Sequence, residues 1–159
     1  MIRLTNLADY AVVLMCYLAQ GSGEIQSAVA LSRHSSLPVP TVSKILGALS
    51  RAGLLKSQRG LGGGFSLARP AEEISVAAIV EALDGPIALT HCVDSGAKDC
   101  DMETLCMMKG HWNKINNAVR GALSEISLSE ISEPSVPVGA LGGQVMGEAA
   151  SGEAKRDRA

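Results

Sequence analysis

Hydrophobic residues in the first fifty positions recur at the spacing of amphipathic helices. A first helix is predicted to begin after Thr5, a favoured N-cap residue, and to end near Gly21. A second helix is expected from about Gln26 to Arg33. The apolar positions of the first helix, which follow a 3.6-residue period, are Leu7, Ala11, Leu14 and Leu18.

A third helix is predicted after the turn at residues 35–38, with Pro40 in its first turn, Arg51 near its end and Gly53 as its C-cap. Two short helices joined by a turn, the second with a polar side, predict a helix-turn-helix unit. The apolar face of this third helix consists of Val42, Ile45, Leu46 and Leu49. Its polar side carries Thr41, Ser43 and Lys44.

The stretch SQRGLGGGFSLARP places four glycines between positions 60 and 64. Strand-like runs at 54–59 and 65–68 flank them and predict a β-hairpin. A phosphate-binding loop is excluded, because such a loop ends in Gly-Lys, whereas Phe65 follows the last glycine. Directly after a helix-turn-helix, the hairpin is interpreted as the wing of a winged helix, with Arg59 at its base and in reach of a minor groove.

Helical periodicity returns further along the chain. Apolar residues between Ile74 and Leu83 predict a short helix that packs on the winged helix. Between Trp112 and Ile126 they recur every three or four positions and predict one helix with a narrow apolar seam. The seam can bury against its own domain or against a second copy. We expect a second copy, because the core is otherwise small, and a homodimer presents two recognition helices to a two-fold DNA site.

These patterns predict a mainly α fold with a small β-hairpin. The expected order is a winged helix-turn-helix DNA-binding domain over 1–84, a cysteine-rich segment over 85–110 and a dimerisation helix over 111–132. The tail, 133–159, is rich in Pro, Gly, Ser, Ala and charged residues without periodicity, and is predicted to be disordered.

Charge is segregated along the chain. No Asp or Glu occurs from Ile25 to Ala71, a stretch with six Lys or Arg, so the remaining residues sum to −8 within a net charge of −2. Such a cationic surface on an acidic chain indicates a nucleic-acid partner more than a merely solvated face. The residues expected to contact double-stranded promoter DNA are Thr41, Ser43, Lys44, Arg51, Lys56 and Arg59.

The chain is expected to be cytoplasmic. The longest apolar run near its start, Ala11–Cys16, is too short to span a bilayer and lacks a signal-peptide layout, so no membrane partner is expected. In the cytoplasm the four cysteines are expected to be ligands or free thiols rather than disulfides.

Three of the four cysteines lie within fifteen residues of one another. Cys92, Cys100 and Cys106 are separated by seven and five residues of polar, glycine-containing sequence and can converge on one metal ion or cluster. A zinc ribbon fits poorly, because the chain has no Cys-x-x-Cys pair. Cys16, in the middle of the first helix, is expected to be a small core residue.

The segments MIRLTNLADYAVVLM and TVSKILGALSRAGLLKSQRGLGGGFSLAR, with the three-cysteine loop followed by HW, resemble the Rrf2 family of bacterial winged-helix regulators over about residues 1–132. The start and the loop most resemble the family's regulators of SUF-type iron–sulfur cluster assembly operons. The resemblance implies a homodimer on a palindromic promoter site, with one iron–sulfur cluster (2Fe-2S or 4Fe-4S) in each subunit. It matches Cys92, Cys100 and Cys106 to cluster ligands, Thr41, Ser43 and Lys44 to the recognition-helix face, and Arg59 to the wing arginine.

The resemblance leaves the fourth cluster ligand open. Lys109 stands where IscR-like members of the family carry a histidine ligand, and a protonated lysine is a poor ligand. Asp9 aligns with the aspartate that completes the cluster in NsrR-like members. His111 is nearer in sequence to the cysteines but two residues out of register. We expect Asp9, with His111 as the alternative.

The sequence therefore predicts a DNA-binding transcriptional regulator that senses iron–sulfur cluster status, redox stress or nitric oxide through a bound cluster and controls iron–sulfur assembly genes. The alternative is a cluster-free repressor whose cysteines respond to oxidation by forming disulfides. An enzyme is not expected, because the chain has no Ser-His-Asp order, His-Glu-x-x-His motif or paired-carboxylate motif.

Overall fold

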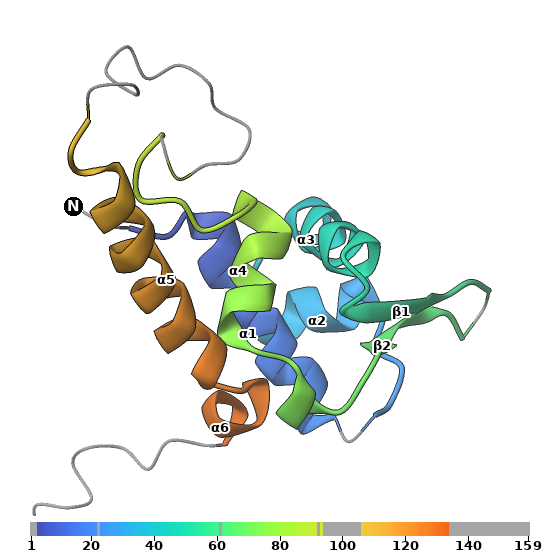
Figure 1. The fold of residues 1–159 in the computed structure, drawn as a ribbon. Coiled ribbons are helices and arrows are strands. Elements are labelled where there is room, and N and C mark those ends of the chain that lie inside the picture. Colours follow the sequence, from blue (N-terminus) through green and yellow to red (C-terminus); the bar gives the residue numbers. More distant parts are fainter. Residues whose placement is uncertain (1–2, 22, 61, 92, 94–105, 134–159) are drawn as a thin grey trace, which may run out of the picture.

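The structure, a computed structural model, describes residues 3–21, 23–60, 62–91, 93 and 106–133. As predicted, it is mainly helical, with one antiparallel hairpin that projects from the helices (Figure 1). No helix in these ranges is long and apolar enough to cross a membrane. The elements are α1 (Asn6–Gln20), α2 (Ala28–Ser35), α3 (Val39–Arg51), β1 (Leu55–Gln58), β2 (Gly64–Leu67), η1 (Ala71–Glu73), α4 (Val76–Asp84), α5 (Lys109–Glu125) and α6 (Leu128–Ser132).

Helix α1 begins and ends where its sequence signals predict. The hydroxyl of Thr5 accepts a hydrogen bond from the Ala8 N–H at 3.2 Å, and Gly21 is the C-cap. The same hydroxyl donates to the carboxylate of Asp84 at 2.6 Å. The start of α1 is therefore fastened to the end of α4.

Helix α2 begins two residues later than predicted. The hydroxyl of Ser27 accepts from the Ala30 N–H at 3.1 Å, so the helix begins at Ala28 rather than Gln26. It ends at the turn into α3, where Ser36 has a left-handed φ of 57°. Side-chain capping, which the apolar period does not report, accounts for the difference.

Helix α3 ends in a left-handed glycine turn. Gly53 has a φ of 74°, and its N–H donates to the Ser50 carbonyl at 3.0 Å. The next N–H, of Leu54, reaches back to the Leu49 carbonyl at 3.0 Å. The cap itself is Ala52, so the predicted capping glycine lies one residue further on. This turn reverses the chain directly into β1.

Strands β1 and β2 pair antiparallel, with Gln58 opposite Gly64 at the turn. Gln26 pairs with Phe65 through two backbone hydrogen bonds of 2.9 Å, which joins the chain before α2 to the hairpin. A Cβ atom on Gly64 would lie 2.5 Å from the Gln26 carbonyl oxygen. Glycine is therefore required where these two backbones meet. We refer to residues 55–67 as the wing.

One hydrophobic core unites the winged helix with α6. The predicted apolar face of α3 is fully buried in it, and Leu128 of α6 is fully buried there too. The core of the winged helix thus extends beyond the predicted span 1–84, and the roles assigned to the spans 85–110, 111–132 and 133–159 remain predictions. The largest buried side chains of this core are Leu14, Met15, Leu18, Leu31, Ile45, Leu46, Leu49, Ile74, Ile79 and Leu128.

The single helix predicted over 111–132 is two helices. Helix α5 ends before Ile126, and α6 begins after Ser127, which forms a capping box with Glu130. Ser127 also pairs with Ser75, the N-cap of α4, in an antiparallel bridge. The bridge requires extended backbone and therefore ends α5. Its hydrogen bonds run from the Val76 N–H to the Ile126 carbonyl at 2.9 Å and from the Leu128 N–H to the Ile74 carbonyl at 2.7 Å.

Candidate nucleic-acid interface and cysteine segment

The two faces of α3 have opposite character. The apolar face is buried, whereas Ser43, Lys44 and Arg51 are exposed and Thr41 is half-buried. The turn before α3 is held by the Ser32 hydroxyl, which donates to the Leu37 carbonyl at 2.6 Å. Helix α3 therefore presents polar and cationic side chains from a fixed scaffold, as a recognition helix must.

The wing carries two further exposed cations. Lys56 lies in β1, and Arg59 follows the last residue of β1. Arg59 therefore lies at the tip of the hairpin, not at its base as predicted, because β1 already ends at Gln58. Gly60, next in the chain, has a φ of 114°, a conformation that side chains with a Cβ rarely adopt.

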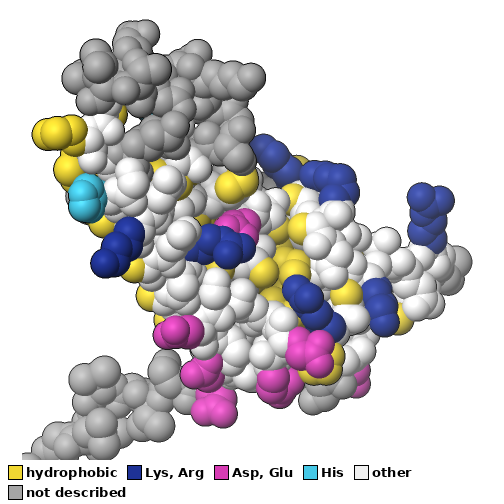
Figure 2. Space-filling model, viewed as in Figure 1, with side chains coloured by type: hydrophobic (Ala, Val, Ile, Leu, Met, Phe, Trp, Pro, Cys, Tyr) yellow, Lys and Arg dark blue, Asp and Glu magenta, His cyan; other side chains and the backbone are white. Residues whose placement is uncertain are grey.

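Positive charge is most extensive over α3 and the hairpin. Lys and Arg side chains gather there, with others over α5, whereas Asp and Glu side chains lie mostly toward the end that holds α6 (Figure 2). The acid-free stretch from Ile25 to Ala71 contains α2, α3 and the wing, so the segregation along the sequence becomes segregation in space. Such a surface attracts the phosphate backbone of DNA.

The structure describes one of the three clustered cysteines. Cys106 is a free, half-buried thiol just before α5, whereas Cys92 and Cys100 lie outside the described residues. Within the described ranges, no three His, Cys, Asp or Glu side chains form a group that could hold a metal ion. The assignment of the three cysteines as ligands therefore remains a prediction.

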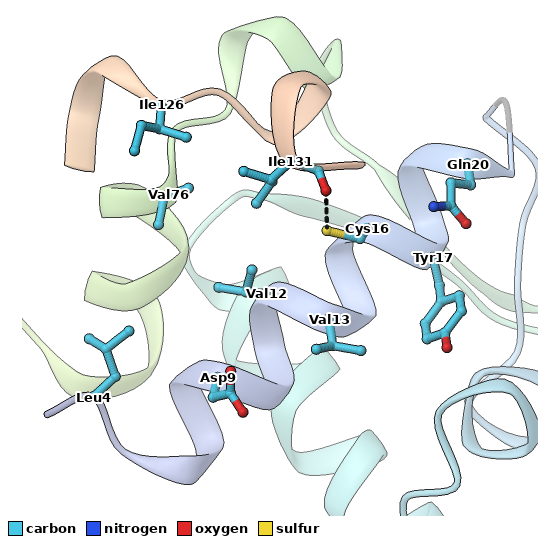
Figure 3. A pocket seen from close by; sticks show the side chains of 10 residues that line it. All are labelled: Leu4, Asp9, Val12, Val13, Cys16, Tyr17, Gln20, Val76, Ile126 and Ile131. Carbon is cyan, nitrogen blue, oxygen red and sulfur yellow. Dashed lines mark hydrogen bonds between the residues drawn. The ribbon is translucent and has the colours of Figure 1, made fainter. Parts of the chain in front are cut away.

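Asp9 and His111, the two candidates for the fourth ligand, lie on different helices. His111 is exposed in the first turn of α5. Asp9 is exposed on α1 and lines a groove of about 520 Å³, which neither His111 nor Cys106 lines (Figure 3). The structure thus does not bring Asp9, His111 and Cys106 together within one chain.

The groove beside Asp9 is mainly apolar. Leu4, Val13 and Ile126, which line it, are 41%, 40% and 40% exposed. Cys16 also lines it and donates a hydrogen bond to the Ile131 carbonyl at 3.7 Å (Figure 3). Burial raises the pKa of the Cys16 thiol, and its side chain packs against the core. Cys16 was predicted to be a small core residue; it packs against the core but is only half-buried, at the edge of the groove.

The predicted apolar seam of α5 divides into two faces. Trp112, Val119 and Leu123 are half-buried and share one face with the buried Asn116. The other face is exposed, with successive spacings of three, four and four residues that place its members in one line along the helix. It consists of Ile115, Ala118, Ala122 and Ile126, the residue just beyond the helix.

Three polar side chains that the sequence reasoning missed join α5 to its neighbours. Asn116 hydrogen-bonds the backbone of residues 87–89, and Arg120 contacts Glu81 with Nε–Oε1 at 2.7 Å. The hydrogen bonds and charge of Arg120 lower the pKa of the Glu81 carboxyl. A sequence signal for Asn116 existed: it is an amide four residues, about one turn, after Trp112, within the apolar pattern.

Comparison with known proteins agrees with this architecture. The profile of the Rrf2 family, described as an iron-dependent transcriptional regulator, matches residues 4–134. Over 130 residues the chain is 32% identical to the HTH-type transcriptional regulator IscR of Photorhabdus laumondii, with 81% of this chain and 78% of that protein covered.

Solved structures show the same fold. CymR, the global cysteine regulator of B. subtilis, superposes with a TM-score of 0.63 at 25% identity over 83% of this chain and 97% of CymR. The oxidised form of Staphylococcus aureus CymR superposes with a TM-score of 0.61 at 28% identity over 84% of this chain and 98% of that protein. On the family match and these likenesses, the chain belongs to the Rrf2 family of DNA-binding transcriptional regulators, which are not enzymes.

Proposed function

We propose that the chain acts as a homodimer that binds a two-fold promoter site and responds to an iron–sulfur cluster held by its cysteine-rich segment. The observation that carries DNA recognition is the division of α3 into a buried apolar face and an exposed polar face inside an acid-free stretch. The family profile, described as an iron-dependent transcriptional regulator, supports a response to iron. Control of iron–sulfur assembly genes, SUF-type operons among them, is part of this proposal and rests on the resemblance of the start of the chain and of its cysteine loop.

The DNA contacts are assigned by residue chemistry. Thr41, Ser43 and Lys44, in the first half of α3, face the edges of bases in the major groove. Arg51 and Lys56 contact phosphates. The guanidinium of Arg59, at the tip of the wing, enters the adjacent minor groove, where narrow A·T-rich segments attract arginine.

A second copy of the chain is the partner that suits the exposed apolar surface. Ile126 belongs to both the exposed face of α5 and the groove along α1, so the two apolar surfaces are continuous. Ala118 and Ala122 are small enough to let another helix approach closely. Burial of this surface between two copies removes it from water and places the two α3 helices on one DNA site.

The donor set suits an iron–sulfur cluster. Three thiolates, from Cys92, Cys100 and Cys106, are the ligands that such clusters prefer. Cys106 is half-buried next to a helix end instead of being enclosed in the core, and it forms no disulfide. Asp9 supplies the fourth ligand, with His111 as the alternative; from its groove, Asp9 completes the cluster of the other subunit. The bound cluster supplies the redox- and iron-sensitive chemistry.

The second candidate is a cluster-free thiol sensor. The likeness to CymR, one structure of which is an oxidised form, favours it. In this function the same three cysteines form disulfides on oxidation and change the promoter affinity without a metal.

Anaerobic purification separates the two candidates. A brown protein with visible absorption bands and with iron and sulfide in each subunit supports the cluster. A colourless, iron-free protein that binds the promoter in a thiol-dependent manner contradicts it and supports the thiol sensor.

Single substitutions then test the ligands. Cys92→Ala, Cys100→Ala and Cys106→Ala should each abolish stable cluster binding and shift promoter affinity in the direction that cluster loss does. Asp9→Ala should leave a labile cluster with an altered spectrum, and Cys16→Ala, the matched control, should behave like the parent. A normal cluster in all three cysteine variants contradicts the proposal. A normal spectrum in Asp9→Ala with an altered one in His111→Ala reassigns the fourth ligand.

A further inference from the structure

Asn116 is the buried polar side chain among the described residues, with 4% of its surface exposed. Its polar neighbours on α5, Asn113 and Asn117, are exposed. Burial of a carboxamide costs free energy unless its donor and acceptor are both hydrogen-bonded. Both polar atoms of Asn116 have partners, and both partners belong to residues 87–89.

The geometry resembles the pairing of two strands. The Asn116 Nδ2 donates to the Ile87 carbonyl at 2.8 Å, and its Oδ1 accepts from the Leu89 N–H at 3.0 Å. The opposite orientation of the amide would set donor against donor, so the amide orientation is fixed. Residues 87–89 lie outside the helices and strands, so this one side chain provides the backbone pairing that a strand neighbour otherwise gives.

A carboxylate of α4 lies beside the same stretch. The Ile87 N–H faces the Glu81 carboxylate, on α4, and helps to lower the pKa of that carboxyl, after the larger contribution of Arg120. The carboxylate accepts from Arg120, one turn after Asn116, with Nε–Oε1 at 2.7 Å and Nη2–Oε2 at 3.2 Å. The Ile87 carbonyl is therefore bound by Asn116 of α5, and the carboxylate that the Ile87 N–H faces is bound by Arg120 of the same helix.

The position of this stretch along the chain gives the contact a role. Leu89 precedes Cys92 by three residues, at most about 10 Å of extended chain. Cys106 leads directly into α5. The Cys92 side of the cysteine-rich segment is thus connected to α5 through the hydrogen bonds of Asn116, and the Cys106 side is connected to α5 by the covalent chain.

We propose that Asn116 is a positioning residue. It holds residues 87–89, which lead into the cysteine-rich segment, against α5 and thereby stabilises the cluster that this segment binds. The inference rests on the cluster assigned under Proposed function. The role of Asn116 also couples cluster binding in the cysteine-rich segment to the exposed apolar face of α5, because Asn116 and Ile115 are adjacent residues of one helix.

The test uses Asn116→Leu, which removes both hydrogen bonds at similar size, and Asn116→Asp, which keeps the acceptor for the Leu89 N–H. Asn117→Leu is the matched control on the exposed side of α5. Amide hydrogen exchange of Leu89 in the cluster-free protein and the rate of cluster loss to a chelator in the anaerobic holoprotein are measured. Asn116→Leu should raise both rates on the order of tenfold, which is the usual size of the effect when an outer contact of a metal ligand is removed. Asn116→Asp should raise exchange less, and Asn117→Leu should match the parent.

The outcomes separate the two proposals. If Asn116→Leu speeds Leu89 exchange but loses the cluster at the parental rate, the role of Asn116 is overturned and the cluster assignment stays intact. Unchanged Leu89 exchange in Asn116→Leu has the same meaning. A parent protein without iron and sulfide overturns both, and this is known before any variant is compared. If Asn116→Leu does not fold, Asn116→Asp decides: cluster loss at the parental rate overturns the role, and faster loss supports it.

Discussion

Lys56 and Arg59 are three positions apart on the wing, yet their chemistry suits different parts of DNA. Lys56 lies within β1, whereas Arg59 lies where the turn begins. An ammonium group is a compact point charge suited to a phosphate, whereas a guanidinium is planar and presents several donors in fixed directions. The two residues therefore allow affinity and sequence discrimination to be tested separately.

Arg59→Ala is expected to weaken binding to the specific promoter by about 1–3 kcal/mol and to reduce discrimination against other sequences, because a groove contact is lost. Lys56→Ala is expected to weaken binding to all DNA about equally and to reduce the slope of log affinity against log salt by roughly one. Fluorescence anisotropy at several salt concentrations measures both effects.

Lys114→Ala is the matched control, because Lys114 is an exposed cation on α5, outside the acid-free stretch. It should retain parental affinity after correction for the small change in net charge. Parental affinity in both wing variants, with the dimer intact, would remove the wing from the DNA-binding surface.

At the scale of single elements, two neighbouring glycines in the turn of the wing differ in the space that a side chain would find. A Cβ atom on Gly63 would lie 2.5 Å from the Gln58 carbonyl oxygen and 2.9 Å from that of Gly60. A Cβ atom on Gly62 would meet nothing within 4 Å. Because the atoms around Gly63 belong to the backbone, they can yield only if the whole turn moves.

Gly63→Ala is therefore expected to lower the free energy of unfolding by about 1–3 kcal/mol, the usual cost of forced contacts, and to weaken promoter binding through the displaced Arg59. Gly62→Ala should change stability by no more than about 0.5 kcal/mol. Urea denaturation and promoter titration of both variants provide the comparison, and equal behaviour of the two would show that the turn adapts freely.

Elements with local signals were predicted well. The bounds of α1 and α3 follow from residues within or beside each helix, namely Thr5, Gly21 and Pro40. The break between α5 and α6 was missed because Ile126 continues the apolar period. A signal was nevertheless present, since Ser127 and Glu130 have the spacing of a capping box.

Contacts between distant residues could not be predicted from the pattern. The pairing of Gln26 with Phe65 and of Asn116 with residues 87–89 joins parts of the chain that are brought together only by the folded core. The polar face of α3 was recognisable in advance, because a helix of known period separates Ser43 and Lys44 from its buried residues. The polar face of α3 could thus be predicted from the sequence, whereas the contacts that hold residues 87–89 beside α5 could not.

At the scale of the whole molecule, the proposed dimer is expected to depend on the exposed face of α5. Ile115→Glu combined with Ala118→Glu places two charges on this face without altering the half-buried Val119. We expect the dissociation constant of the dimer to rise about 100-fold or more, because burial of unpaired charge costs several kcal/mol. Promoter affinity should fall with it, and sedimentation velocity measures the change.

Asn117→Glu is the control for that variant, because it adds charge at an exposed position away from the apolar line. It should remain dimeric with parental promoter affinity. A doubly substituted protein that stays folded and dimeric would show that the exposed face of α5 does not join the two subunits.

The bridge between Ser75 and Ser127 has a consequence for synthesis of the protein. Helices α1 and α3 leave the ribosome early, but Leu128, which completes their shared core, lies 53 residues beyond Ser75. At translation rates of about 5–20 residues per second, this interval lasts roughly 3–10 s. During it, the nascent chain carries an unfinished DNA-binding unit with uncovered apolar surface. Because Leu128 completes the core, we expect competence to bind a promoter to be acquired only after both ends of the cysteine-rich segment have been made.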